Sequence, residues 1–76
     1  MESPIGAVFG VVLREKREAA GISQEQLADR AGLHRTYVSL IERGKRTASI
    51  EVVRKVAKAL NVSMASLIDE TEKRRG

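Results

Sequence analysis

The side chains best suited to chemistry in this chain are the cations of a single segment, residues 30–46. Five of the 14 Lys and Arg residues lie there, opposed by one carboxylate, Glu42. The rest of the chain carries nine basic and nine acidic residues, so this segment accounts for the whole net charge of +4. Cations gathered on a small domain attract phosphate-rich polymers. The segment therefore predicts a surface for a polyanionic partner.

Catalytic and metal-binding constellations are missing from the sequence. The chain has no Cys and a single His, His34, with no carboxylate near it in the sequence. The serines fall mostly at predicted helix starts, and there is no glycine-rich phosphate-binding loop. We therefore expect no enzyme activity, no metal, no cofactor and no small-molecule ligand. A chain without cysteine is also compatible with a reducing compartment, and we expect a cytoplasmic protein.

The composition predicts one all-α domain over residues 1–76. Hydrophobic residues make up 42% and charged residues 32%, which is typical of a chain that folds in water. Phe9 and Tyr37 are the only aromatic residues, so aliphatic side chains must build the core, as in packed helices. The apolar run from Pro4 to Leu13 follows Glu2 and is too short to span a membrane, so no membrane partner is expected.

Helical periodicity and capping residues divide the chain into five helices. Apolar residues recur at helical spacing from Ile5, and Gly21 is expected to end the first helix. Three serines preceded by apolar residues are typical N-caps of later helices, namely Ser23, Ser49 and Ser63. The predicted helices cover about residues 5–20, 24–31, 34–43, 50–60 and 64–71. We expect residues 72–76 to form a frayed, flexible tail.

Residues 23–43 have the pattern of a helix-turn-helix, with two short helices joined at Gly32. In that motif the second helix lies in the DNA major groove and the first crosses the phosphate backbone. The inner side of the second helix would carry apolar residues such as Val38 and Ile41. Its outer side is polar or cationic except at one position, and comprises Arg35, Thr36, Ser39, Leu40 and Arg43.

Three blocks of the sequence resemble the phage-repressor and Cro-type (XRE-like) helix-turn-helix regulators. They are FGVVLREKR at residues 9–17, GISQEQLA at 21–28 and GLHRTYVSLIERGKR at 32–46. The resemblance covers about residues 5–70 and implies a compact five-helix bundle of the lambda-repressor-like type that binds double-stranded DNA. The run Arg35-Thr36-Tyr37 is similar to the controller proteins of restriction-modification systems. Antitoxins, which would also bind a toxin, and phage-type repressors share much of this pattern and are the alternatives.

The resemblance implies that three side chains of the recognition helix read bases. Arg35 can donate two hydrogen bonds to guanine, and Thr36 can bond a base or touch a thymine methyl group. Ser39 can bond a base or a phosphate. Phosphate contact or simple solvation are the alternatives for Arg35, and Ser39 can equally be a neutral surface residue. Leu40 stands where a polar residue is expected and could read only DNA shape or a thymine methyl group.

The resemblance also implies contacts to the phosphate backbone. Gln24, at the start of the first motif helix, would bind a phosphate beside the free N–H groups of that helix end. Tyr37 could aim its hydroxyl at a phosphate while its ring packs on the scaffold. The cations of the following loop, Arg43, Lys45 and Arg46, would position the protein without reading sequence. The alternatives are that Gln24 is simply an exposed helix residue, that the Tyr37 ring serves only packing, and that the loop cations are only solvated.

Two further expectations concern the scaffold and the assembly. The resemblance implies a structural ion pair between Arg17 and Glu42 that fixes the angle of the recognition helix. One such helix reads about four or five base pairs, which is too few to single out a genomic site, so we expect a homodimer on a pseudo-palindromic operator. RNA polymerase is a further candidate partner at the promoter.

The dimer interface is expected in region 50–71, on an apolar stripe of the last two helices. Its candidate residues are Met64, Leu67, Ile68, Val52 and Val56. The alternative is that this stripe merely closes the core of the monomer.

Overall fold

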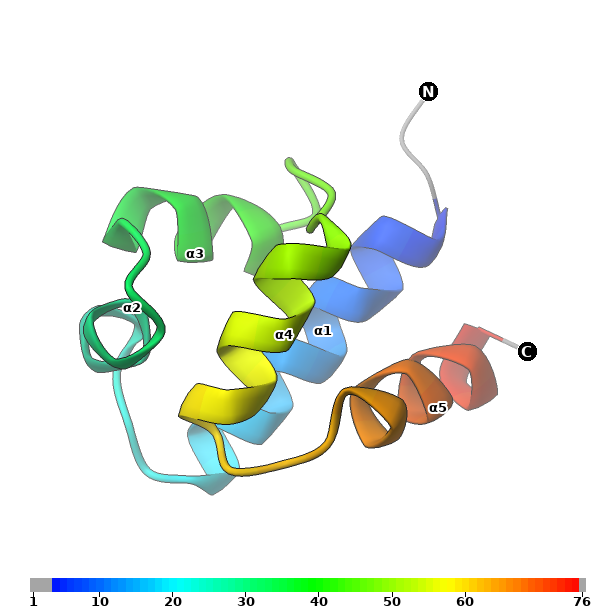
Figure 1. Ribbon diagram of the computed structural model, residues 1–76. Coiled ribbons are helices and arrows are strands. Elements are labelled where there is room, and N and C mark those ends of the chain that lie inside the picture. The colour runs from blue at the N-terminus through cyan, green and yellow to red at the C-terminus, as the bar shows by residue number, and fades with distance from the viewer. Residues whose placement is uncertain (1–3, 76) are drawn as a thin grey trace.

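Five helices form between residues 4 and 75, the part of the chain that the structure, a computed structural model, describes (Figure 1). They are α1 (Pro4–Ala19), α2 (Gln24–Ala31), α3 (Arg35–Glu42), α4 (Ile50–Ala59) and α5 (Met64–Arg75). No strand occurs in this described range. The predicted all-α fold is thereby confirmed. None of these helices combines the length and the hydropathy needed to cross a bilayer, over the same residues.

Short-range hydrogen bonds set the helix starts. The Ser23 hydroxyl accepts the backbone N–H of Gln26 at 3.0 Å, and the Gln26 side chain accepts the Ser23 N–H at 2.8 Å, which completes a capping box. Ser49 caps α4 at 3.2 Å from the Val52 nitrogen, and the Ser63 hydroxyl accepts the Ser66 N–H at 3.0 Å. These bonds confirm the three serine-capped starts. The starts could be predicted because each bond spans only three residues and needs no tertiary context.

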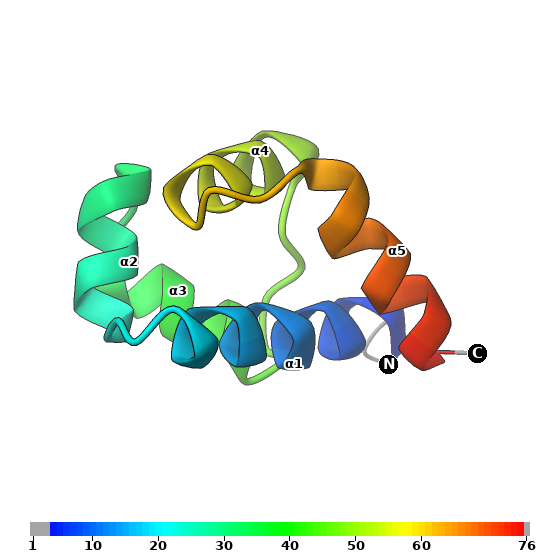
Figure 2. The ribbon, with the colours of Figure 1, turned by 90° about the horizontal axis from the view of Figure 1, so that it is seen from below.

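The helices enclose an aliphatic core. In Figure 2, α1 runs along the molecule, with α2 at one end and α5 at the other. Helix α1 packs on both α3 and α5, while α2 packs on α3 and α4. The largest side chains that are almost completely buried come from all five helices and include Leu13, Leu27, Ile41, Val56 and Leu67.

Helix α1 approaches the end of α3 closely at Gly10. A Cβ atom added there would lie 2.2 Å from the Ile41 carbonyl oxygen and 3.0 Å from that of Glu42. The distance of 2.2 Å is too short for any side-chain carbon, so only glycine allows this approach. The contact places the C-terminal end of the recognition helix directly on the backbone of α1.

The predicted tail is wrong for residues 72–75, because α5 continues through them to Arg75. Ion pairs connect the C-terminal half of α5 to α1. Arg74 pairs with Glu15, and Lys16 pairs with Glu70 one turn earlier. Contacts of this kind between distant helices are not revealed by short-range sequence patterns. Gly76, the last residue of the predicted tail, lies outside the described residues.

Three of the predicted dimer-interface residues belong to the core of the monomer instead. Val56 and Leu67 have no exposed surface, and Val52 is only 8% exposed. A partner subunit cannot contact side chains that are covered by their own chain, so their assignment to the interface was wrong. Met64 is half-buried, and Ile68 is 43% exposed. The apolar stripe thus divides between the core and the surface.

Candidate nucleic-acid interface

Helix α3 separates an apolar inner side from a polar outer side. Val38 and Ile41 are fully buried against the core. Arg35 and Thr36, at the start of the helix, are exposed, whereas Ser39 is half-buried. In Figure 1 the helix lies along the upper edge of the molecule, where no other helix covers its outer side. This arrangement leaves the first turn of α3 accessible to a groove of DNA.

The side chain of His34 caps α3. This residue has extended backbone angles, and its Nδ1 accepts the backbone N–H of Thr36 at 3.3 Å. From the sequence we expected His34 only to open the helix, and its capping bond was missed. The available signal was its place directly before the apolar period, where an acceptor side chain is favoured. His34 is exposed, next to Arg35.

The loop after α3 presents three exposed cations, Arg43, Lys45 and Arg46. Gly44 turns the chain with a φ of 74°. The backbone N–H of Lys45 then bonds the Leu40 carbonyl at 2.9 Å, which ties the loop to the helix end. The predicted phosphate-binding cations therefore follow the recognition helix on a short, hydrogen-bonded turn.

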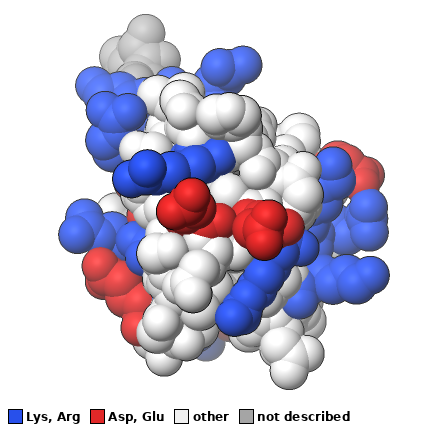
Figure 3. All heavy atoms as spheres, turned by 90° about the vertical axis from the view of Figure 1, so that its left-hand side faces the viewer, with Lys and Arg blue, Asp and Glu red and all other residues white. Residues whose placement is uncertain are grey.

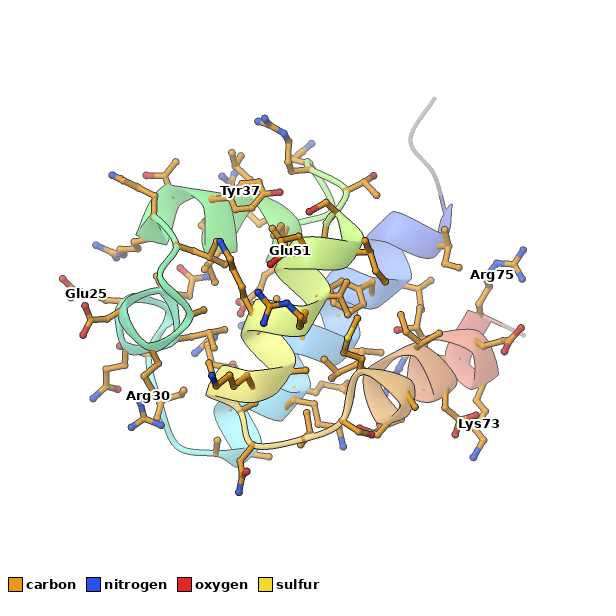
Figure 4. The ribbon with its side chains drawn as sticks, viewed as in Figure 1. Glu25, Arg30, Tyr37, Glu51, Lys73 and Arg75 are labelled. Carbon is orange, nitrogen blue, oxygen red and sulfur yellow. The ribbon has the colours of Figure 1, made fainter. Side chains whose placement is uncertain are left out.

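Tyr37 connects this loop to the recognition helix. Its ring is half-buried and packs against the core cluster. The guanidinium carbon of Arg46 lies 5.6 Å from the ring centroid, which is the range of a cation–π contact. Figure 4 shows Tyr37 on α3, near the loop that leads to α4. The ring thus restricts where Arg46 can direct its charge.

Glu42, at the end of α3, binds side chains from α1 and from the start of α2. Arg17 donates to its carboxylate from Nε at 2.7 Å and from Nη2 at 3.0 Å. The Arg17 side chain is 11% exposed and that of Glu42 only 2%. The hydrogen bonds and the charge of Glu42 raise the pKa of Arg17 above its usual value, against the opposing effect of burial. The expected ion pair is present and largely shielded from water.

Two additional bonds extend this pair into a network. The Arg17 Nη1 donates to the Ile22 carbonyl at 2.8 Å, and the Gln24 Nε2 donates to the Glu42 Oε1 at 2.9 Å. Gln24 is half-buried and bonded to Glu42, so the protein orients its amide before any ligand is present. No sequence pattern indicated the contact between Gln24 and Glu42, which lie 18 residues apart. One N–H of the Gln24 amide is engaged by Glu42, and the amide has a second.

The end of the molecule formed by α2 and the start of α3 carries charges of both signs. Figure 3 shows carboxylates between groups of Lys and Arg on this face. A surface hollow between the two helices is lined by Glu25, Asp29, His34 and Arg35, among others. The cations near the recognition helix therefore act beside local carboxylates and not within a uniformly positive field.

Comparisons with known proteins agree with this geometry. A family model described as helix-turn-helix matches residues 13–67. Control protein C.BamHI of Bacillus amyloliquefaciens is 43% identical over 72 residues, which is 93% of this chain and 89% of that protein. Control protein C.SmaI of Serratia marcescens is 43% identical over 56 residues, 74% of this chain and 67% of that one.

A solved structure shows the same fold. The restriction-modification controller protein C.AhdI from Aeromonas hydrophila superposes with a TM-score of 0.78 at 46% identity, covering 80% of this chain and 92% of its own. The family model covers more than half of the chain, and C.AhdI is similar to it in both sequence and fold. This chain therefore belongs to the XRE-like helix-turn-helix family of DNA-binding transcription regulators, and control proteins of restriction-modification systems are among its relatives.

Proposed function

We propose that this protein is the controller of a restriction-modification system and regulates transcription as a homodimer on a pseudo-palindromic operator. The observation that carries the proposal is helix α3, whose first turn exposes Arg35 and Thr36 while its inner side is fixed in the core. Relatives that are named control proteins and match along most of their length favour this role. RNA polymerase is the expected second partner at the promoter.

In the proposed complex, side chains of α3 and its neighbours divide into two groups. The base-reading group is Arg35, Thr36 and Ser39. The phosphate-binding group is Gln24, Tyr37, Arg43, Lys45 and Arg46. Exposure supports Arg35, Thr36 and the three loop cations directly. Gln24 would bind phosphate through the amide N–H that Glu42 leaves free, beside the N–H groups at the start of α2.

A second copy of the chain would bind at the end of the molecule that holds α5. There Ile68 and Ile5 are 43% and 46% exposed, and both line an apolar hollow of about 260 Å³. Phe9 and Val53 form part of the same lining. Ile68 and the half-buried Met64 are the members of the predicted interface that a partner subunit could still contact. Ile5 is not among the interface residues predicted from the sequence, because its helical spacing indicated a place in the core.

The dimensions of the subunit fit this assembly. Its longest axis is 30 Å, and helix-turn-helix dimers place their recognition helices about 34 Å apart, one turn of DNA. Each α3 would have to lie about 17 Å from the two-fold axis, half of that spacing, which is within the length of one subunit. A two-fold interface at the α5 end is therefore compatible with two copies of α3 in successive major grooves. Each helix would then read one half of the operator.

Selection of bound sequences from random duplex DNA, followed by sedimentation of the complex, tests the proposal. We expect enrichment of a pseudo-palindrome with half-site centres about 10 base pairs apart, bound by two copies of the chain. Enrichment of a single half-site bound by one copy would contradict the dimer. Failure to enrich any sequence would contradict the operator itself.

A further inference from the structure

His34 is an unusual residue for the cap that starts the recognition helix. The residues favoured at this position, Ser, Thr, Asp and Asn, place one acceptor close to the backbone. The imidazole of His34 provides that acceptor with Nδ1, 3.3 Å from the Thr36 nitrogen. Its ring also carries a second nitrogen, Nε2, which lies further from the backbone than any polar atom of these shorter caps. The residue therefore has a polar atom that capping does not use.

The capping bond determines what this second nitrogen can do. A neutral imidazole has one donor nitrogen and one acceptor nitrogen, and the bond made by one nitrogen sets the state of the other. In the neutral imidazole, Nδ1 can accept the Thr36 N–H only when the proton is on Nε2. His34 is exposed, and the bond to the Thr36 N–H is the only hydrogen bond of its side chain among residues 4–75, although the carboxylates of Glu25 and Asp29 line the same surface hollow. The cap therefore leaves an N–H donor directed away from the helix backbone.

The position of this donor suggests its acceptor. His34 directly precedes Arg35 and Thr36, the exposed residues at the start of α3. When the first turn of a recognition helix reaches base edges, the residue before it lies at the rim of the groove, where phosphate oxygens are the nearest acceptors on the DNA. We propose that His34 both caps α3 and donates its Nε2–H to a backbone phosphate of the operator. This inference rests on the proposed DNA complex and adds a contact to it.

The proposed contact has a signature that differs from those of the loop cations. A hydrogen bond to a charged phosphate oxygen is stronger than one between neutral groups, so its loss should weaken binding about tenfold per half-site, or about 1.4 kcal/mol. A neutral imidazole displaces no counterion when it binds a phosphate. Loss of the contact should therefore leave the salt dependence of binding unchanged, whereas loss of Lys45 should reduce it.

Two substitutions separate the cap from the contact. Asn in His34→Asn keeps an acceptor near the position of Nδ1 but cannot reach as far as Nε2. Gln in His34→Gln carries an N–H about as far out as Nε2 but is a poor cap. Melting temperature measures the cap, and affinity for the selected operator, titrated at several salt concentrations, measures the contact. His34→Ala, which removes both, is the reference variant.

We expect the two variants to rank in opposite order by melting temperature and by operator affinity. His34→Asn should melt at least as high as the wild type yet bind about tenfold more weakly per half-site, with an unchanged salt slope. His34→Gln should melt lower but bind more tightly than His34→Asn. Nitrogen NMR of the free wild type should show the proton on Nε2, and DNA should shift that resonance.

Normal operator affinity in His34→Asn would overturn the contact, because the cap alone would then explain the residue. A neutral imidazole with its proton on Nδ1 in the free protein would overturn it as well, since Nε2 could not then donate. Failure of the wild type to bind any selected duplex would instead overturn the proposed operator, and the contact with it. The NMR measurement needs no DNA, so these failures are distinguishable.

Discussion

Residues that lie close together at the recognition helix can make different kinds of contact with DNA. Arg35 and Thr36 are exposed in the first turn of α3, and in the proposed complex their hydrogen bonds to base edges would discriminate between sequences. Lys45 lies in the loop beyond the helix, where a cation can neutralise a phosphate of any sequence. Specificity and general affinity should therefore depend on different side chains.

Substitution of Arg35 and of Lys45 should separate these two effects. Arg35→Ala should relax the preference at one base position per half-site, at a cost of about 1–3 kcal/mol in discrimination. Lys45→Ala should weaken all sequences alike and reduce the salt slope by about one unit per lost contact. Titrations on matched operators that differ at one base measure both effects. Identical behaviour of the two variants would contradict the assignment.

Tyr37 should act on DNA partly through Arg46, because its ring lies under the guanidinium at 5.6 Å. Tyr37→Ala and Arg46→Ala should each weaken binding, but the double variant should lose less than the sum, by about 0.5–1 kcal/mol. Tyr37→Phe is the control, because it keeps the ring and removes only the proposed contact of the hydroxyl. Strictly additive losses in a double-mutant cycle would show that the two residues act independently.

Among the elements, helix α3 is held at its C-terminal end by two other helices. Glu42 accepts hydrogen bonds from Arg17 on α1 and from Gln24 on α2. Gly10 lets the backbone of α1 approach the same helix end. A recognition helix needs a defined angle to its DNA groove, and these contacts restrict that angle from two sides.

Glu42→Ala should therefore lower both stability and DNA affinity. The Arg17 guanidinium would lose its partner in a largely buried site, which costs about 3–5 kcal/mol for a buried pair. Glu18→Ala is the matched control, because the pair of Glu18 with Arg14 is exposed and should contribute at most about 1 kcal/mol. Thermal denaturation and operator titration give the two readouts. Unchanged melting with normal binding of Glu42→Ala would contradict the structural role of the pair.

Across the subunit as a whole, the proposed DNA and dimer surfaces involve different elements. The proposed DNA surface lies on α3, the start of α2 and residues 43–46. The apolar hollow lined by Ile5 and Ile68 lies mainly between α1 and α5, and Thr47 and Ala48 after the loop also line it (Figures 1 and 2). A subunit can therefore hold a partner and a half-site at the same time. In such an arrangement, a subunit bound to its half-site holds the second subunit close to the other half-site, so dimerisation strengthens operator binding.

Ile68→Glu should dissociate the dimer without unfolding the subunit, because the side chain is 43% exposed but would be buried against a second copy. Operator affinity should fall with the dimer. Val11→Glu is the matched control, since Val11 is also 43% exposed but lies outside the lining of the hollow. Sedimentation velocity gives the oligomeric state and circular dichroism the fold. An unchanged sedimentation coefficient in Ile68→Glu would place the interface elsewhere.

The five helices and the polar outer side of α3 could be predicted from the order of the amino acids. Serine caps bond to backbone groups three residues away, and a helical apolar period places its residues on one side of the same helix. These features depend on groups that are close together along the chain. The blocks that resemble the family are also contiguous, and the pair of Arg17 with Glu42 was expected from that resemblance.

The packing of the helices was needed to establish which apolar residues remain on the surface and which partners meet across the fold. Val52, Val56 and Leu67 form a stripe that could have been exposed, and the other helices bury it. Likewise, Gln24 meets Glu42 18 residues further along the chain. Burial and long-range hydrogen bonds depend on how distant helices pack, and a pattern within one helix carries no record of its neighbours.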